Sequence, residues 1–376
     1  MITPISTAPE YFPTGTCHEK WQLCPDWSSL RACGFALGHA AVMCFIDYEA
    51  GDTRFGRCPR SLLNRTLDRL NTVHHVSECL LGFEIEFVLL DESFQLFRPM
   101  DSVSNYSRTA GLRAETLTLV EEIVQALKRS SIDIWHFHTE AADQLEIALA
   151  PQSPMLAIDS LVLAQETIRT ICARHHLRAS MTPRPVHGWP QNGCHMHISM
   201  LDLQCSDHFI AGILSHMESL CAFGMANYDS YFRVIEDGAG KWVGWGTNSR
   251  DLPVRRVGHN HLEIRAMDAT ANPYLFVAAT IFAGCNGLHK KIPLAWKDCS
   301  LLSSKLDEDQ RIAHGIVKTM PKCLKDALSF LKVDDTMEAG VTSELLTQYV
   351  VVKETDAVGF DQMSEEQRRL RFLEYF

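Results

Sequence analysis

The spacing of apolar residues divides the chain into helical and extended segments. A recurrence every three to four residues predicts helices over residues 59–73, 113–129, 154–173, 207–226 and 272–288. Runs rich in apolar residues, several alternating with polar ones, predict strands over residues 39–48, 53–55, 80–90, 132–138, 145–149, 195–200 and 261–266. The glycine-rich stretch 228–258 is expected to be a loop, and the remainder to residue 376 helical. Since no βαβ repeat emerges, the α+β class is favoured.

Three of the expected strands carry pairs of polar side chains two residues apart. Residues at this spacing point to the same face of a strand. A single pair of this kind is often a solvated face or a surface ion pair. Three pairs in one chain instead indicate strands that line a cavity for metal and phosphate. The pairs are Glu84 and Glu86, His195 and His197, and Glu263 and Arg265.

The candidate ligands are mostly carboxylates, which suit hard cations such as Mg²⁺ or Mn²⁺. They are Glu84, Glu86, Glu140, Glu146 and Glu263, joined by the imidazole of His195. Zinc would more typically recruit thiolates or several histidines, and Cys194 is expected to face away from His195. Arginines whose planar groups suit phosphate accompany this set, namely Arg233, Arg250, Arg255 and Arg265. Acids for Mg²⁺ combined with arginines indicate phosphoryl transfer, although the chain has no P-loop motif.

Composition excludes several other classes of protein. The 376 residues carry a formal net charge of -11, so a nucleic-acid surface is not expected. No apolar run reaches the length of a membrane span, and no secretory signal is recognised at the start. The 13 cysteines include no CxxC, which favours reduced thiols and a cytoplasmic protein.

Five segments resemble, in order, the motif series of the glutamine synthetase family. They are residues 81–87, 140–146, 193–199, 250–255 and 263–275. The stretches at 135–140 and 242–246 are most similar to fungal glutamine-synthetase-like proteins of the FluG type. The resemblance implies a catalytic domain over residues 76–376, with a curved antiparallel sheet flanked by helices. Residues 1–75 are then expected to be a truncated β-grasp remnant and linker, shorter than the front domain of the family.

The same resemblance implies a role for each matched residue. One metal ion would be held by Glu86, Glu140 and Glu146, and the second by Glu84, His195 and Glu263. Phosphate contacts would come from His197, Arg250 and Arg255, and a nucleotide contact from Ser199. The carboxylate substrate and the transferred phosphate would be held by Arg233 and Arg265, which makes Arg233, Arg250 and Arg265 the expected catalytic arginines.

The implied activity is ATP-dependent amide formation with Mg²⁺ or Mn²⁺, through an acyl phosphate. The partners would be a small-molecule carboxylate and an amine, in an enzyme expected to be a homo-oligomer. Ala239 stands where bacterial enzymes have a glutamate that helps to deprotonate ammonium, which favours an organic amine and a place in specialised metabolism. Two alternatives stay open. One is a degenerate regulatory or scaffold protein, and the other is a metal-dependent amide hydrolase or acyl transferase that does not use ATP.

Local departures from the family pattern generate further expectations. The spacing from Glu140 to Glu146 is one residue short, so the loop between them tightens or one carboxylate is displaced. His261 stands where the family typically has an arginine, which weakens a nucleotide contact or makes it pH-dependent. His136 and His138 are expected to be hydrogen-bonding residues of the core or rim rather than ligands. Trp242 and Trp245 could wall an amine pocket, but buried anchors of their loop are the favoured interpretation.

Overall fold

A single mixed sheet organises the computed structural model, which describes the chain except for residues 1–21, 48–55, 77, 98–105, 114 and 201–205. The strand order is β10 (Trp245–Thr247), β11 (Val254–Gly258), β12 (His261–Ile264), β9 (Met196–Met200), β5 (Cys79–Leu90), β7 (Gln144–Leu149) and β6 (Ile134–Thr139). A short strand, β8 (Arg178–Ser180), also pairs with β5. Every pairing is antiparallel except that of β10 with β11. Strands and helices in this arrangement confirm the expected α+β class.

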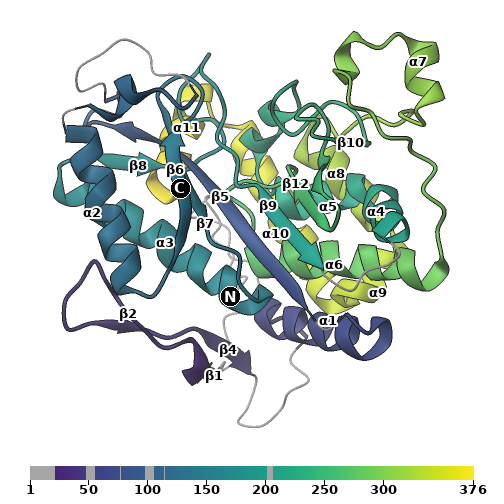
Figure 1. The fold of residues 1–376 in the computed structure, drawn as a ribbon, viewed down its shortest axis with the longest axis horizontal. Helices are drawn as coiled ribbons and strands as arrows, with labels where there is room; N and C mark the ends of the chain where they lie inside the picture. The colour runs from purple at the N-terminus through teal and green to yellow at the C-terminus, as the bar shows by residue number, and fades with distance from the viewer. Residues whose placement is uncertain (1–21, 48–55, 77, 98–105, 114, 201–205) are drawn as a thin grey trace.

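The long strand β5 joins the two halves of the sheet (Figure 1). Its first residues, Cys79 to Phe83, pair with β9, and Glu84 to Val88 pair with β7 on the opposite edge. The residues just before β9 also follow β5, because the backbone N–H of Glu84 donates to the carbonyl of His195 at 3.0 Å. The change of partner therefore occurs beside the Glu84–Glu86 pair.

Two rows of residues cross the sheet because of this register. In one row Glu86 on β5 lies opposite Glu146 on β7, which lies opposite His138 on β6. In the other row His197 on β9 lies opposite Glu263 on β12, which lies opposite Arg255 on β11. Directly opposed side chains on neighbouring strands are within interaction distance. The register thus collects polar side chains from six strands on one face.

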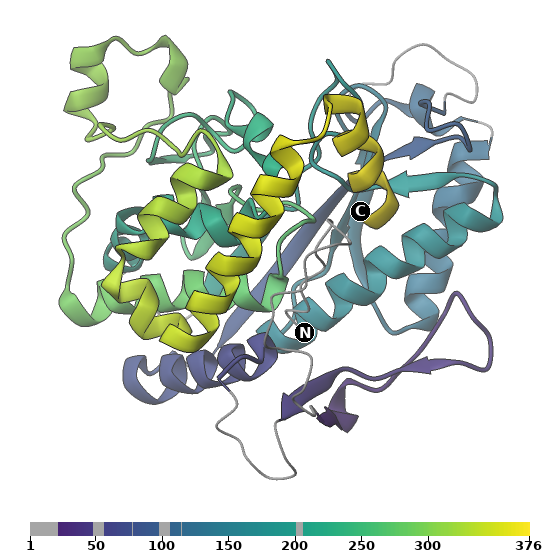
Figure 2. The same ribbon diagram turned by 180° about the vertical axis from the view of Figure 1, so that it is seen from behind.

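Helices provide the rest of the core. The first six are α1 (Pro59–His74), α2 (Glu115–Arg129), α3 (Pro154–Arg174), α4 (Ser206–Ser215), α5 (Met217–Gly224) and α6 (Pro273–Lys290). The last five are α7 (Glu308–Ala313), α8 (Leu324–Lys332), α9 (Asp335–Val341), α10 (Ser343–Asp361) and α11 (Glu365–Tyr375). Seen from behind, α3 in teal and α10 in yellow-green lie in front of β5 (Figure 2). None of the helices in the described ranges combines the length and apolar content that a membrane crossing requires.

Helix α6 illustrates how the sequence sets an element. Pro273 occupies its first turn, where a missing N–H costs no hydrogen bond. The side chain of Asn272 caps this end by accepting from the backbone N–H of Leu275 at 3.1 Å. The following residues are almost all apolar, and α6 is buried against α1 and α4. An N-terminal cap and an apolar surface together explain why this predicted helix forms.

Several predicted elements differ from the structure. The helix expected over 207–226 is interrupted at His216, whose Nδ1 lies 2.9 Å from the Asp334 carboxylate. The expected loop 228–258 contains a 3₁₀ helix (Tyr228–Arg233) and the strands β10 and β11. The strand expected over 39–48 is divided between β3 (Ala40–Ala41) and β4 (Cys44–Asp47), which pair with β2 (Arg31–Ala32) and β1 (Gln22–Pro25). The short strand predicted at 53–55 lies outside the described residues.

A buried arginine connects the N-terminal strands to the main core. Arg60 on α1 pairs with Asp159 on α3, and its other terminal nitrogen lies 2.5 Å from Asp26, which follows β1. Its guanidinium also lies over the rings of Phe45 and Tyr274. The Arg60 and Asp159 side chains are 4% exposed, so each charge is largely removed from water. Such a charge requires its partner, because an unpaired buried ion is strongly destabilising.

Replacement of Arg60 with methionine is therefore expected to destabilise the fold by about 3–5 kcal/mol, since Asp159 would keep a buried charge without its partner. The measurement is the free energy of unfolding from urea titration. Lys332→Ala is the matched control, because Lys332 pairs with Glu354 on the surface and such pairs contribute about 1 kcal/mol or less. Equal losses in the two variants would contradict a structural role for the buried pair.

Candidate active site

A cavity of about 1020 Å³ opens on the face of the sheet that carries the two rows. Eleven of the twelve site residues expected from the sequence line it, and Arg233 alone does not. The eleven are Glu84, Glu86, Glu140, Glu146, His195, His197, Ser199, Arg250, Arg255, Glu263 and Arg265. Segments far apart in the sequence therefore converge on one space, as the paired motifs predicted. Its size is at the upper end of the range for small-molecule sites.

Glu84 lies between two histidines of the 193–199 segment. One carboxylate oxygen is 2.9 Å from Nδ1 of His195, and the other is 2.9 Å from Nε2 of His197. Burial raises the pKa of Glu84, but the hydrogen bonds from these two imidazoles outweigh it and lower the pKa below its ordinary value. Glu84 is therefore held as a carboxylate. Nδ1 of His197 in turn lies 2.8 Å from Nε2 of His261, which also lines the cavity.

Two arginines clamp Glu263 from either side. Nη1 of Arg255 donates to one of its oxygens at 2.8 Å, and Nη1 of Arg265 donates to the other at 2.6 Å. The Glu263 side chain is only 1% exposed, so these charge-assisted bonds compensate for its lost hydration. Nδ1 of His195 lies 3.4 Å from the same carboxylate. The prediction that Glu263 and Arg265 share a face is confirmed.

A second group of acids is more crowded than its cations can neutralise. Glu86 faces Glu146 across the sheet and accepts a 2.6 Å hydrogen bond from the backbone N–H of Gly193. Burial is the main reason that the pKa of Glu86 is raised. Burial, followed by the charges of Glu146 and Glu86, raises the pKa of Glu140 to about 7. Added positive charge at this position would relieve the repulsion.

These donor sets fit divalent cations. Glu84, His197 and Glu263 offer ligand atoms within 4.8 Å of one another, with His195 adjacent. Carboxylate oxygens with few imidazoles suit Mg²⁺ or Mn²⁺. The three acids Glu86, Glu140 and Glu146 supply the repulsion that a second ion would neutralise. Arg250, Arg255 and Arg265 line the same cavity and provide the positive charge that a polyphosphate requires.

Arg233 lies beneath the cavity wall instead of on it. Its guanidinium donates to the carbonyls of Met267 at 2.8 Å and Arg265 at 3.0 Å, and the side chain is 1% exposed. It also approaches Nε2 of His195 at 3.5 Å. In this position Arg233 contacts the strands that carry the site but does not reach the space above them. Gly193 allows the close packing, because a Cβ there would lie 2.8 Å from the Arg233 guanidinium.

The short spacing between Glu140 and Glu146 is absorbed by a tight turn. Ala142 and Asp143 adopt positive φ angles of 33° and 66°. The backbone N–H of Glu140 donates to the carbonyl of Gln144 at 2.9 Å, which closes the turn between β6 and β7. Glu140 consequently still lines the cavity. Of the two expected outcomes, the structure has the tightened loop.

The segment after Arg233 brings two acids to the cavity. Ala239 is buried, and its backbone N–H donates to the Arg233 carbonyl at 2.7 Å. Glu236 and Asp237 line the cavity instead. Nη2 of Arg265 donates to the Asp237 carbonyl at 3.0 Å and fixes this segment against β12. A buried alanine thus stands at the position where the sequence comparison expects the family glutamate, and two acids lie nearby on the cavity wall.

Trp242, Trp245 and Cys194 serve the packing of the site's surroundings. Trp245 is buried, and its Nε1 donates to the carbonyl of Trp296 at 3.0 Å. Trp242 packs on a small apolar cluster and under the Arg311 guanidinium. Neither tryptophan lines the cavity, in agreement with their interpretation as loop anchors. Cys194 is buried, and burial raises the pKa of its thiol well above the ordinary value.

The sequence interpretation missed His136 and His138 as members of the site. Both line the cavity, and both lie beside Glu146. The hydrogen bond with Glu146 raises the pKa of His138 to about 9, against the effect of burial. A His-x-His pair on a strand that precedes a carboxylate-bearing strand was the available signal. It was not used because the spacing left open whether the short connection between β6 and β7 tightens or displaces one carboxylate, and the register of a hairpin depends on its turn.

The chain is similar in sequence to known proteins. Residues 56–372 match the family model described as glutamine synthetase, catalytic domain. Protein fluG of Emericella nidulans is 32% identical over 372 residues, which cover 96% of this chain and 43% of that protein. The chain therefore spans less than half the length of that relative. Gamma-glutamylpolyamine synthetase GlnA3 of Streptomyces coelicolor is 26% identical over 82% of this chain and 71% of its own length.

Solved structures share the fold at low sequence identity. A complex of GmaS with ADP superposes with a TM-score of 0.81 and 22% identity, over 93% of this chain and 85% of the other. The glutamine synthetase of Plasmodium falciparum gives a TM-score of 0.79 and 18% identity, over 98% of this chain and 89% of the other. The expected resemblance is confirmed, and the relatives support the enzyme class predicted from the motifs, an ATP-dependent carbon–nitrogen ligase. The chain belongs to the glutamine synthetase family through its catalytic domain.

Proposed function

We propose that this chain joins a carboxylate to an amine at the expense of ATP, through an acyl phosphate. The observation that carries the proposal is the pairing, in one cavity, of clustered acids and imidazoles with three arginines. Acids for divalent cations together with arginines for phosphate are the parts that phosphoryl transfer needs. Family membership supplies the reaction class.

In the first step a carboxylate oxygen of the substrate attacks the γ-phosphorus of ATP, and the bond to ADP breaks. Arg250, Arg255 and Arg265 line the cavity and would neutralise charge on the transferred group. His197 and Ser199 would contact the nucleotide. Mg²⁺ or Mn²⁺ would be held by two ligand sets and, when bound, would neutralise charge on the phosphates. The sets are Glu84, His195 and Glu263, and Glu86, Glu140 and Glu146. Arg233 would act as a positioning residue beneath His195.

In the second step the amine attacks the acyl carbon, and phosphate leaves with the bonding electrons. The proton that the amine loses needs a base, and Glu236 and Asp237 are the acids on the wall in this region. We propose an organic amine in addition to or instead of ammonia, because Ala239 occupies the family position of the glutamate. The aromatic side chains of Tyr106, Trp135 and Trp189 on the same cavity suit the alkyl part of such an amine. The relative GlnA3, named as a gamma-glutamylpolyamine synthetase, gives a precedent within the family.

The proposal extends to the setting of the enzyme. Its partners would be small molecules, in specialised nitrogen metabolism of the cytoplasm, and the chain would assemble as a homo-oligomer. Residues 1–75 would be a β-grasp remnant and linker, and residues 76–376 the catalytic domain. The FluG relative supports a fungal setting.

Release of ADP with Mg²⁺, ATP and a panel of acids and amines tests the proposed reaction. We expect ADP only when an acid and an amine are both present, with glutamate as the first acid and ammonium, a monoamine and a diamine as nucleophiles. Glu263→Ala should lower the rate by at least about 100-fold, because several kcal/mol of charge stabilisation depend on the metal. No ADP with any pair would favour a regulatory or scaffold protein. Amide hydrolysis without ATP would favour the metal-dependent hydrolase.

Two neighbouring arginines on β11 allow a comparison between a side chain in the cavity and one outside it. Arg255 faces Glu263 in the cavity, whereas Arg256 lies against Trp245 and Asp207. Arg255→Gln is expected to lower kcat/KM for ATP by about 10²-fold, as loss of one donor to developing charge does. Arg256→Gln should leave kcat/KM nearly unchanged in the same steady-state assay. A similar loss in both variants would mean that strand packing, rather than phosphate binding, explains the effect.

A further inference from the structure

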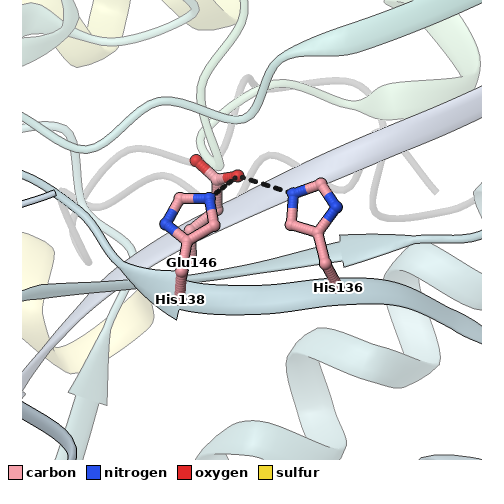
Figure 3. Close-up of side chains that lie close together, drawn as sticks. All are labelled: His136, His138 and Glu146. Atoms are coloured by element: carbon pink, nitrogen blue, oxygen red, sulfur yellow. Dashed lines mark ion pairs between the residues drawn. The ribbon is translucent and has the colours of Figure 1, made fainter. Parts of the chain in front are cut away.

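Two histidines and one glutamate form a group at the edge of the cavity that the family ligand pattern does not include. Strand β6 carries His136 and His138 at alternate positions, so both side chains leave the same face. Glu146 lies directly opposite His138 on β7. Figure 3 shows the two imidazoles standing side by side with the carboxylate beside them. The group is built on paired strands and is therefore held by the sheet.

The three side chains converge on a common point. Nε2 of His138 lies 3.2 Å from Oε1 of Glu146, and Nε2 of His136 lies 3.7 Å from the same oxygen (Figure 3). The imidazole planes are within 13° of parallel, with centroids 5.3 Å apart. One ligand atom from each residue lies within 4.8 Å of the others. Ligands at about 2.0–2.2 Å from a shared ion would be about 3–3.5 Å apart, so only small side-chain movements separate this arrangement from a coordinated one.

The backbone sets the tautomer of His138 when its imidazole is neutral. Nδ1 lies 2.9 Å from the carbonyl oxygen of Thr139, which can only accept, so Nδ1 carries a hydrogen. The lone pair of the neutral ring is then on Nε2, the nitrogen that faces Glu146. A carbonyl that orients the far nitrogen of an imidazole is the usual outer-shell support of a metal-bound histidine.

We propose that Nε2 of His136, Nε2 of His138 and the Glu146 carboxylate bind one divalent transition-metal ion. Two imidazoles and a carboxylate suit Zn²⁺, Co²⁺ or Ni²⁺ better than Mg²⁺, which prefers oxygen ligands. His136 is 44% exposed and the group borders the cavity, so further coordination positions are open to water or substrate. The competing interpretation is a simple ion pair of protonated histidine with Glu146.

This site overlaps the proposed magnesium ligands at Glu146 only. The binding of a transition metal is measurable without ATP, so the inference does not depend on the proposed ligase activity. If no acid and amine pair supports ADP release while Zn²⁺ binds as described, the proposed function fails and this site stands. If Zn²⁺ does not bind here while ADP is released, the proposed zinc site fails and the proposed ligase function stands.

The experiment uses the full chain, stripped of metal by dialysis against a chelator and titrated calorimetrically with Zn²⁺. A second titration uses Co²⁺, whose visible absorption reports nitrogen ligation. The double variant His136→Gln/His138→Gln is expected to lose one equivalent of Zn²⁺, or at least about 100-fold in affinity at that site, since even outer-shell changes cost 10–100-fold. Glu84→Gln should keep this equivalent, because Glu84 belongs to the other ligand group.

His175→Gln is the matched control. His175 forms an exposed pair with Glu122 at 2.7 Å and has no second imidazole in that pair. Its replacement should leave the Zn²⁺ titration and the Co²⁺ spectrum unchanged. The single variant His136→Gln changes a half-exposed position and should also weaken Zn²⁺ binding. It keeps the test valid if the double variant does not fold. Zn²⁺ stoichiometry and affinity equal to wild type in His136→Gln/His138→Gln, with the fold intact by circular dichroism, would overturn the proposal.

Discussion

Like charges held together in one cavity are the constraint on which the rest of this structure depends. Glu86 and Glu146 occupy directly opposed positions on β5 and β7, an arrangement that is unfavourable unless cations compensate. In the neighbouring row the negative charge of Glu263 is balanced, because Arg255 and Arg265 both donate to its carboxylate. Around Glu140 the positive charge does not balance the acids, and the pKa of Glu140 is raised to about 7. An unbalanced cluster of this kind is costly to a fold and is typical of a site that binds a cation.

The sheet maintains this arrangement through its long central strand. Because β5 pairs with β9 along its first half and with β7 along its second, it brings acids and imidazoles from both halves onto one face. Glu84 lies where the partners change, and it is bonded to the two histidines of the 193–199 segment. Below the face, Arg233 packs closely against Gly193 of the same segment. Four of the proposed ligands, Glu84, Glu86, Glu146 and Glu263, thus lie on regular strands, and His195 just before β9 is supported by a buried guanidinium.

Much of the fold was predictable from local patterns, and the failures occur where the pairing partner of a segment decides its structure. Helices α1, α3 and α6 are long segments that contain many apolar residues and have proline in the first turn, and all three formed where expected. The helix break at His216 has no glycine or proline to mark it and depends on a distant partner, Asp334. Strands β10 and β11 lie in a glycine-rich stretch whose composition favours a loop. They form because β11 pairs with β12 in a hairpin and β10 pairs with β11, contacts that the composition of the stretch does not reveal.

The sequence by itself determined which chemistry the site contains. Pairs such as Glu84 and Glu86 must share a face once they lie on a strand, because side chains alternate with a period of two. Tertiary structure alone decided which pairs meet. Strand register placed Glu146 between Glu86 and His138 and joined His136 to the cavity, and packing turned Arg233 beneath the wall. The pairing of β5 with β7 joins residues far apart in the chain, so no local pattern could specify it.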